Sequence, residues 1–72
     1  MWQFVAHHVM RPPLWTWRRL NRSGTVAQQS AVSFSSYRKA VHDATRHGFD
    51  PAVDAHEKVE ERPDAEKRKS AV

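Results

Sequence analysis

Hydrophobic side chains fall in three short runs in the first half of the chain. The run at residues 2–10 reads WQFVAHHVM, and RPP then ends it, because proline cannot donate a hydrogen bond to a neighbouring strand. A second run, LWTWRRL at residues 14–20, is followed by NRSG and then by TVAQQSAV at residues 25–32. Asn at the first turn position and Gly at the last are typical of a type I turn closed by a glycine bulge. The pattern therefore predicts three strands, with the second and third joined as a hairpin.

Pairing of Asn21 with Thr25 across this turn fixes which side chains share a face of the sheet. The predicted cross-strand pairs are Leu20 with Val26, Trp17 with Gln29, Trp15 with Ala31 and Leu14 with Val32. Because side chains alternate along a strand, Trp15 and Trp17 share one face with Arg19. The leucines and valines of the same two strands lie on the other face.

The spacing changes to that of a helix after the third run, in SFSSYRKAVHDATRHGF at residues 33–49. Apolar residues recur at i, i+3, i+4 and i+7: Tyr37, Ala40, Val41 and Ala44. The serines before them offer an N-cap, Gly48 ends the helix, and Phe49 can pack back as the hydrophobic partner of a Schellman cap. We therefore expect an α+β fold, a three-stranded antiparallel sheet followed by one helix packed on one face, in a β-β-β-α domain over residues 1–49.

Residues 50–72 have a different composition, with seven acids, five Lys or Arg, two prolines and few large apolar side chains. Such a segment buries too little apolar surface to offset the entropy of ordering it. The sequence predicts a charged, mostly disordered tail there.

Charge is divided in the same way. The chain carries a formal net charge of +4. Residues 1–48 hold seven Lys or Arg and one acid, Asp43, which gives +6, and residues 49–72 hold five bases and seven acids, which gives −2. A basic body attracts polyanions through its summed field, so nucleic acid and acidic proteins are the expected partners.

The sequence argues against a protein that depends on cysteine chemistry and against one that is secreted or crosses a membrane. Without cysteine there are no disulfides and no thiolate chemistry. The apolar N-terminus has no basic n-region and is far shorter than the roughly 18 apolar residues that cross a membrane. We therefore expect a cytoplasmic protein with no membrane partner.

Residues 14–48 resemble the YegP-like small bacterial domains of unknown function. The matching positions are Trp15, Trp17, Arg18, Gly24, Val26, Ser30, Phe34 and Ser35. The resemblance implies strand-strand-strand-helix units, often two to a chain, of unassigned biochemical role. This chain departs from the family in three ways: it has one copy of the unit, its turn reads NRSG in place of a tight Asn-Gly turn, and WTWRRL has one residue more than the family's WRWRL. The extra residue predicts a bulge near Arg18 and Arg19. A second resemblance, of strand order and motif, is to the arm-type DNA-binding domains of tyrosine recombinases.

The tryptophans and arginines of the hairpin allow two interpretations. Trp15 and Trp17 could stack on bases while Arg18, Arg19 and Arg22 contact phosphates, as in sheet-based nucleic-acid binders. Alternatively, both rings lie beneath the helix and belong to the core, as aromatic side chains usually do in small domains. The face that the helix covers distinguishes the two.

Histidine spacing favours no metal site. His7 and His8 are adjacent on a strand and point to opposite faces, and His42 and His47 are five residues apart on the helix. Asp43 and His47, four apart, are better suited to a pair on the helix surface. We predict no catalytic residues and no cofactor, because no nucleophile has a partner base and both glycines serve a turn or a cap.

The sequence therefore indicates a small non-enzymatic interaction module. One helix covers one face of a sheet, so apolar residues on the other face meet water or a partner. We expect a homo-oligomer, a homodimer formed through the sheet. The alternative is a DNA- or RNA-binding domain that uses a basic, tryptophan-bearing sheet surface.

Overall fold

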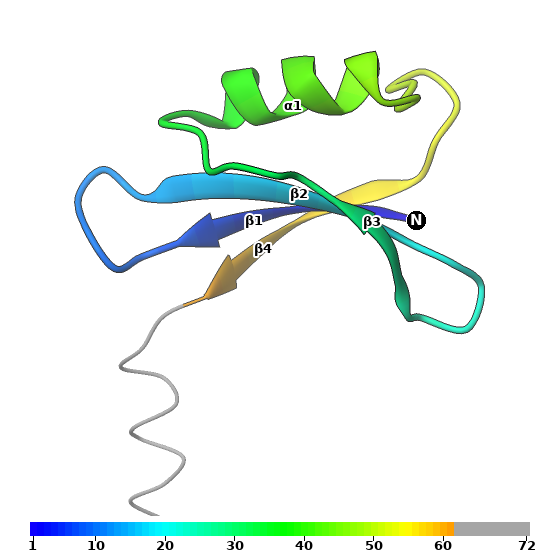
Figure 1. The fold of residues 1–72 in the computed structure, drawn as a ribbon, viewed down its shortest axis with the longest axis horizontal. Helices are drawn as coiled ribbons and strands as arrows, with labels where there is room; N and C mark the ends of the chain where they lie inside the picture. The colour runs from blue at the N-terminus through cyan, green and yellow to red at the C-terminus, as the bar shows by residue number, and fades with distance from the viewer. Residues whose placement is uncertain (62–72) are drawn as a thin grey trace, which may run out of the picture.

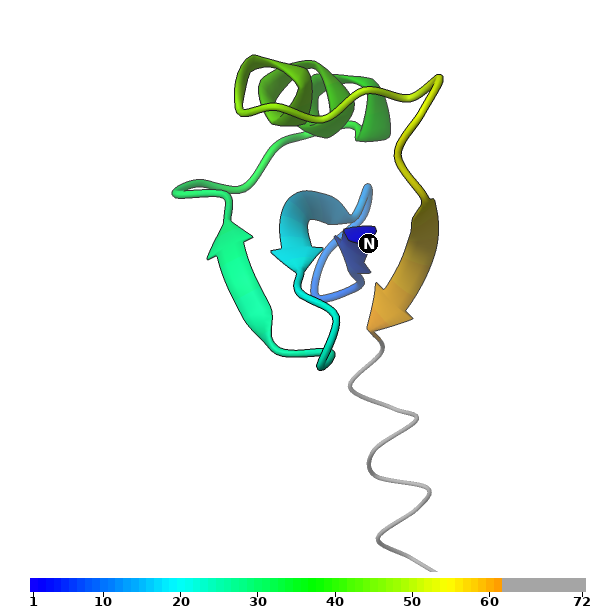
Figure 2. The ribbon, with the colours of Figure 1, turned by 90° about the vertical axis from the view of Figure 1, so that its right-hand side faces the viewer.

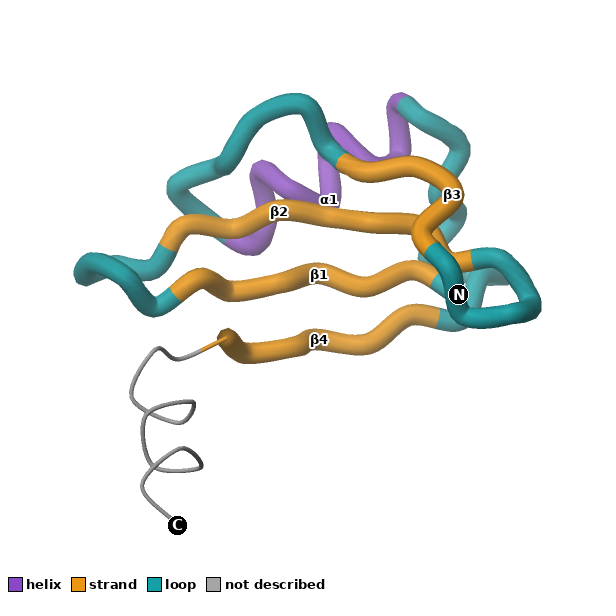
Figure 3. Tube along the Cα trace, turned by 60° about the horizontal axis from the view of Figure 1, so that its bottom comes forward, coloured by secondary structure: helices purple, strands orange, loops and turns teal. Residues whose placement is uncertain are grey.

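The computed structural model of the chain describes residues 1–61. Its elements, in order, are β1 (Trp2–His7), β2 (Leu14–Leu20), β3 (Val26–Gln29), α1 (Tyr37–Arg46) and β4 (His56–Glu61). The strands form one sheet in the order β3-β2-β1-β4, and α1 lies across one face of it (Figures 1 and 3). The α+β class is confirmed.

The prediction of three antiparallel strands is wrong, because the sheet has four strands and is mixed. β4 pairs with β1 in parallel, from Trp2 opposite His56 to His7 opposite Glu61. Figure 2 shows the connection after α1 returning to the sheet beside β1. Residues 56–61 thus form an edge strand where we expected a solvated tail, and the sheet extends past the predicted boundary at residue 49. The rest of that tail, residues 62–72, lies outside the described residues.

The predicted hairpin turn is confirmed. The Asn21 N–H donates to the Thr25 carbonyl at 2.9 Å, and the Gly24 N–H donates to the Asn21 carbonyl at 3.0 Å. Gly24 has φ of 87°, in the left-handed region that a side chain disfavours. The Asn21 side chain also accepts from the N–H groups of Ser23 and Thr25, which explains the choice of Asn at this position.

The register agrees with the prediction only next to the turn. Leu20 lies opposite Val26 as expected, and a bulge then shifts the pairing between Arg19 and Leu20. The bulge predicted near Arg18 and Arg19 is therefore present. Beyond it, Arg18 takes the position opposite Gln29 that we had assigned to Trp17. The backbone of Trp15 pairs with Phe34 instead of Ala31. The residue left without a partner is Ala27 of β3 and not a residue of WTWRRL, and it moves the later pairs of β2 with β3 by one position.

Both ends of α1 have the predicted caps. The Ser36 hydroxyl accepts the Lys39 N–H at 3.2 Å at the first turn. At the last turn, Gly48 has φ of 106°, and the Phe49 N–H donates to the Ala44 carbonyl at 3.0 Å. This is the hydrogen bond of a Schellman motif, and it folds Phe49 back to a 4% exposed position in the core.

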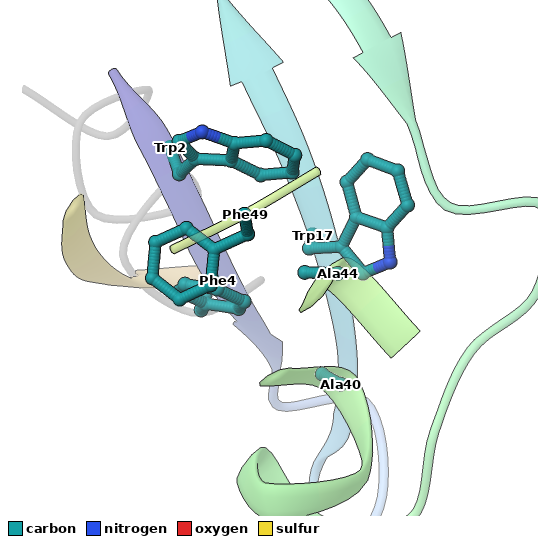
Figure 4. Packing of buried hydrophobic residues seen from close by; sticks show 6 residues of the cluster. All are labelled: Trp2, Phe4, Trp17, Ala40, Ala44 and Phe49. Atoms are coloured by element: carbon teal, nitrogen blue, oxygen red, sulfur yellow. The ribbon is translucent and has the colours of Figure 1, made fainter. Parts of the chain in front are cut away.

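The helix covers the tryptophan face of the sheet. The core cluster consists of Trp2, Phe4, Trp17, Ala40, Ala44 and Phe49 (Figure 4). The small side chains of Ala40 and Ala44 let the helix approach the aromatic rings closely. The ring centroids of Trp2 and Trp17 are 5.4 Å apart, and those of Trp2 and Phe49 5.2 Å. The interpretation of Trp17 as core is thus the one that the structure supports.

No helix within residues 1–61 has the length and apolar character that crossing a membrane requires.

Candidate functional site

The five candidate residues of the hairpin do not share one surface. Trp17 is 1% exposed beneath α1, and Trp15 is half-buried with its ring 5.2 Å from that of Tyr37. Arg18 points to the opposite face, and Arg19 and Arg22 are exposed at the end of the sheet and in the turn. A buried Trp17 has no free ring face for a base, so the sheet surface that we predicted for nucleic acid is not assembled.

The uncovered face of the sheet is crossed by polar side chains that join β2, β1 and β4. Arg18 Nε donates to Gln3 Oε1 at 2.6 Å, and Gln3 Nε2 in turn donates to Glu57 Oε1. Near the other end, His7 Nε2 lies 2.8 Å from Thr16 Oγ1, and its Nδ1 lies 3.8 Å from a Glu61 carboxylate oxygen. These groups satisfy one another within the chain, so this face offers little unpaired charge to a ligand.

Val5 is buried between these two polar rows. It is 1% exposed and lies opposite Thr16 on β2 and Val59 on β4. Among residues 1–61, the exposed large hydrophobic side chains lie mainly at the ends of elements and in turns: Met1, Val9, Met10, Val26, Val32 and Val53. The uncovered face therefore carries a polar network over a small apolar centre.

The outer side of α1 carries the strongest unpaired charge. Arg38, Lys39, His42 and Arg46 are all exposed there, and we call these four residues the basic helix face. Within the part of the chain that the structure describes, the three ion pairs all have histidine as the cation and none involves Lys or Arg. The three permanent charges of this face are thus uncompensated by a neighbouring carboxylate.

A cleft of about 410 Å³ opens between α1 and the segment that precedes it, and we call it the α1 cleft. Its lining consists of Phe34, Asp43 and the basic helix face. Phe34 is held rigidly, because its N–H and carbonyl both pair with the backbone of Trp15 at 2.7 Å. The volume lies within the roughly 300–1,000 Å³ of small-molecule sites, with one aromatic wall and a basic rim.

Asp43, the acid that lines the α1 cleft, accepts a hydrogen bond from a core side chain. Asp43 Oδ2 accepts the indole N–H of Trp17 at 2.8 Å. The same oxygen lies 3.7 Å from His47 Nδ1, which confirms the predicted pair on the helix surface. The carboxylate therefore anchors α1 to the sheet and is only partly available to cancel the positive charge around it.

A second cleft, of about 540 Å³, lies on the other side of α1 toward β4. Its lining includes Val41, Phe49, Pro51 and His56, and it shares Arg38 and His42 with the α1 cleft. The segment beside it is acidic, since residues 50–61 contain five Asp or Glu and one Lys. Lys39 and Arg46 line only the α1 cleft, whereas Arg38 and His42 line both clefts.

No group of three or more His, Asp or Glu side chains lies close enough to hold a metal ion in residues 1–61. The histidines have other contacts: His7 and His8 face Glu61 and Glu60 of β4, and His47 faces Asp43.

Sequence reasoning missed the basic helix face as a site, although a signal for it was present. Arg38, Lys39, His42 and Arg46 follow helical spacing, and the first turn of the helix contains no acid. From the sequence, we assigned no role in binding to Arg38, Lys39 and Arg46. The contribution of Phe34 could not be derived in this way, because its pairing with Trp15 lies three positions beyond the predicted Ala31, and the bulge accounts for one of the three.

Comparison of the sequence with protein-family models finds no match, and the searches of curated proteins and of solved structures find no matching protein either. The resemblances to YegP-like domains and to recombinase arm-type domains stay predictions.

Proposed function

We propose that this chain is a small non-enzymatic interaction module that binds a polyanionic macromolecule through the basic helix face. The observation that carries the proposal is that Arg38, Lys39 and Arg46 gather around the α1 cleft and that none of them forms an ion pair within residues 1–61. Exposed charges of one sign attract an oppositely charged partner and speed its association. Binding of this kind weakens as salt rises, because neutralised phosphates release counterions.

The proposal differs from our sequence-based alternative in where the partner lies. That alternative used Arg18, Arg19 and Arg22 with the two hairpin tryptophans. Arg18 is already bonded to Gln3, and Trp17 is buried. The sheet face also has a cleft, of about 220 Å³ and lined by Arg18 and part of Trp17, but Arg18 is its one permanent cation and is already bonded to Gln3, whereas Arg38, Lys39 and Arg46 are all exposed around the α1 cleft.

Two double variants with the same net charge test this location. Arg38→Glu with Lys39→Glu alters the helix face, and Arg19→Glu with Arg22→Glu alters the end of the sheet and its turn. Acidic residues are favoured in the first turn of a helix by its dipole, so the helix variant should keep its fold. We expect the helix variant to elute from a heparin column at a clearly lower salt concentration than the sheet variant. Equal shifts for the two variants would mean that net charge alone attracts the polyanion, which contradicts the proposal.

Two other expectations from the sequence stay predictions. Self-association through the sheet would require a partner surface over the polar rows of the uncovered face, and light scattering decides it by giving the mass of one chain or of two. A cytoplasmic location suits a module that meets nucleic acids or acidic proteins, and fractionation of cells that express the chain would test it.

A further inference from the structure

We infer that the α1 cleft takes single-stranded nucleic acid, with an unpaired base against Phe34 and its phosphates on the basic helix face. This inference rests on the proposed function, since it names the polyanion that the face would bind. It assigns separate roles to the aromatic wall of the cleft and to its charged rim.

The Phe34 ring is suited to stacking because the backbone of this residue is held in place beside the cleft. The residue is half-buried, and two backbone hydrogen bonds of 2.7 Å tie it to Trp15. Part of the side chain packs against the core and part lines the cleft. Nucleic acid bases stack on such aromatic side chains with little dependence on sequence, because every base has a flat face.

The charged rim is long enough to contact more than one nucleotide. Lys39 and Arg46 are seven residues apart, which is about 10 Å along the axis of α1 at 1.5 Å per residue. A stacked strand rises about 3.4 Å per nucleotide, and a strand that places one base on the ring is more extended, so at most about three nucleotides span the same distance. Arg38 and His42 extend the rim on the outer side.

A single strand fits this arrangement better than a duplex does. In a duplex each base is stacked and paired, so no base can reach the ring in the cleft without leaving the helix at an energetic cost. A single strand presents its bases without that cost. A duplex would therefore use only the rim, whereas a single strand would use both the rim and Phe34.

The same reasoning favours nucleic acid over an acidic peptide. Carboxylates of a peptide would bind Arg38, Lys39 and Arg46, but a carboxylate has no flat apolar face that could stack on the ring of Phe34. The charge of Asp43 opposes phosphate binding, but its Oδ2 accepts the Trp17 indole N–H from the core, and three permanent cations line the same cleft.

The test measures fluorescence anisotropy of a labelled 12-nucleotide single-stranded DNA and of the matching 12-base-pair duplex, with the full chain at low ionic strength. We expect the single strand to bind at least about fivefold tighter, since stacking of one base is worth about that factor or more. Phe34→Leu keeps an apolar side chain in place but removes the aromatic face. It should weaken single-strand binding about fivefold and leave duplex binding unchanged, while Phe34→Tyr should restore the preference. Thermal unfolding of both variants confirms that each is folded.

Equal affinities for single strand and duplex, with Phe34→Leu no weaker than the parent, would overturn the inference. So would competition by polyglutamate as effective as that by the oligonucleotide. These outcomes are separate from failure of the proposed function, in which Arg38→Glu with Lys39→Glu would bind every polyanion as well as the parent does.

Discussion

Asp43 connects the core of the protein to its proposed binding surface through one carboxylate. Its Oδ2 accepts the indole N–H of Trp17, a side chain that is 1% exposed. Trp17 would otherwise carry a mostly buried donor with no partner. Asp43 is also the one acid of the α1 cleft, so the same side chain lowers the positive potential there.

Replacing Asp43 should separate these two effects. Asp43→Ala leaves the indole N–H without its acceptor, and we expect the free energy of unfolding to fall by about 1–3 kcal/mol. Asp43→Asn keeps an acceptor oxygen, so the loss should be smaller, while removal of the negative charge should raise the affinity for polyanions. Urea unfolding followed by tryptophan fluorescence measures the first effect, and heparin elution measures the second. An Asp43→Ala chain as stable as the parent would show that the hydrogen bond contributes nothing.

Single residues differ in how much of their role the sequence reveals. Asn21 and Gly24 were predicted correctly, because a tight turn depends on residues within four positions of one another. The candidate role of Trp17 depended on which face α1 covers, which alternation along a strand leaves open. Phe34 was part of a family resemblance, but its pairing with Trp15 lies three positions past the predicted one, a shift that the regular register of the hairpin does not contain.

At the scale of elements, α1 and β4 show where sequence patterns succeed and fail. α1 has its N-cap at Ser36 and its Schellman cap at Gly48 and Phe49, all local signals. β4 reads HEKVEE, with Val59 as its one large apolar residue. Its glutamates look like a solvated segment until they are placed beside β1. There the partner of Glu57 is Gln3, 54 positions away in the sequence, which no local pattern could show.

Val59 offers a direct test of β4. It is half-buried and lies opposite Val5, which is 1% exposed, so Val59→Asp would place a charge against the apolar centre of the uncovered face. We expect a loss of about 1–3 kcal/mol in the free energy of unfolding. Val53→Asp, at a turn residue that is 78% exposed, is the matched control and should change stability by less than about 0.5 kcal/mol. If urea unfolding showed equally small losses of stability for Val59→Asp and Val53→Asp, residues 56–61 would belong to the solvated tail that the sequence predicted.

At the scale of the whole molecule, the two sides of α1 differ in charge. The α1 cleft has Arg38, Lys39 and Arg46 without ion-pair partners among the described residues, whereas the second cleft has only Arg38 of these three and lies toward the acidic β4. The sequence predicted the overall split between a basic body and an acidic segment. It did not predict that β4 would join the sheet at the edge farthest from β3, which keeps the acids away from the α1 cleft.

The location of the bound polyanion is the central claim, and a titration of the ¹⁵N-labelled chain with the 12-nucleotide single strand tests it most directly. Amide chemical shifts report which backbone groups change environment on binding. We expect the largest changes at Phe34, Lys39, His42 and Arg46, with little change on the uncovered face of the sheet. Changes concentrated instead around Gln3, in β1 and on its neighbours across the sheet, with α1 unaffected, would contradict the account.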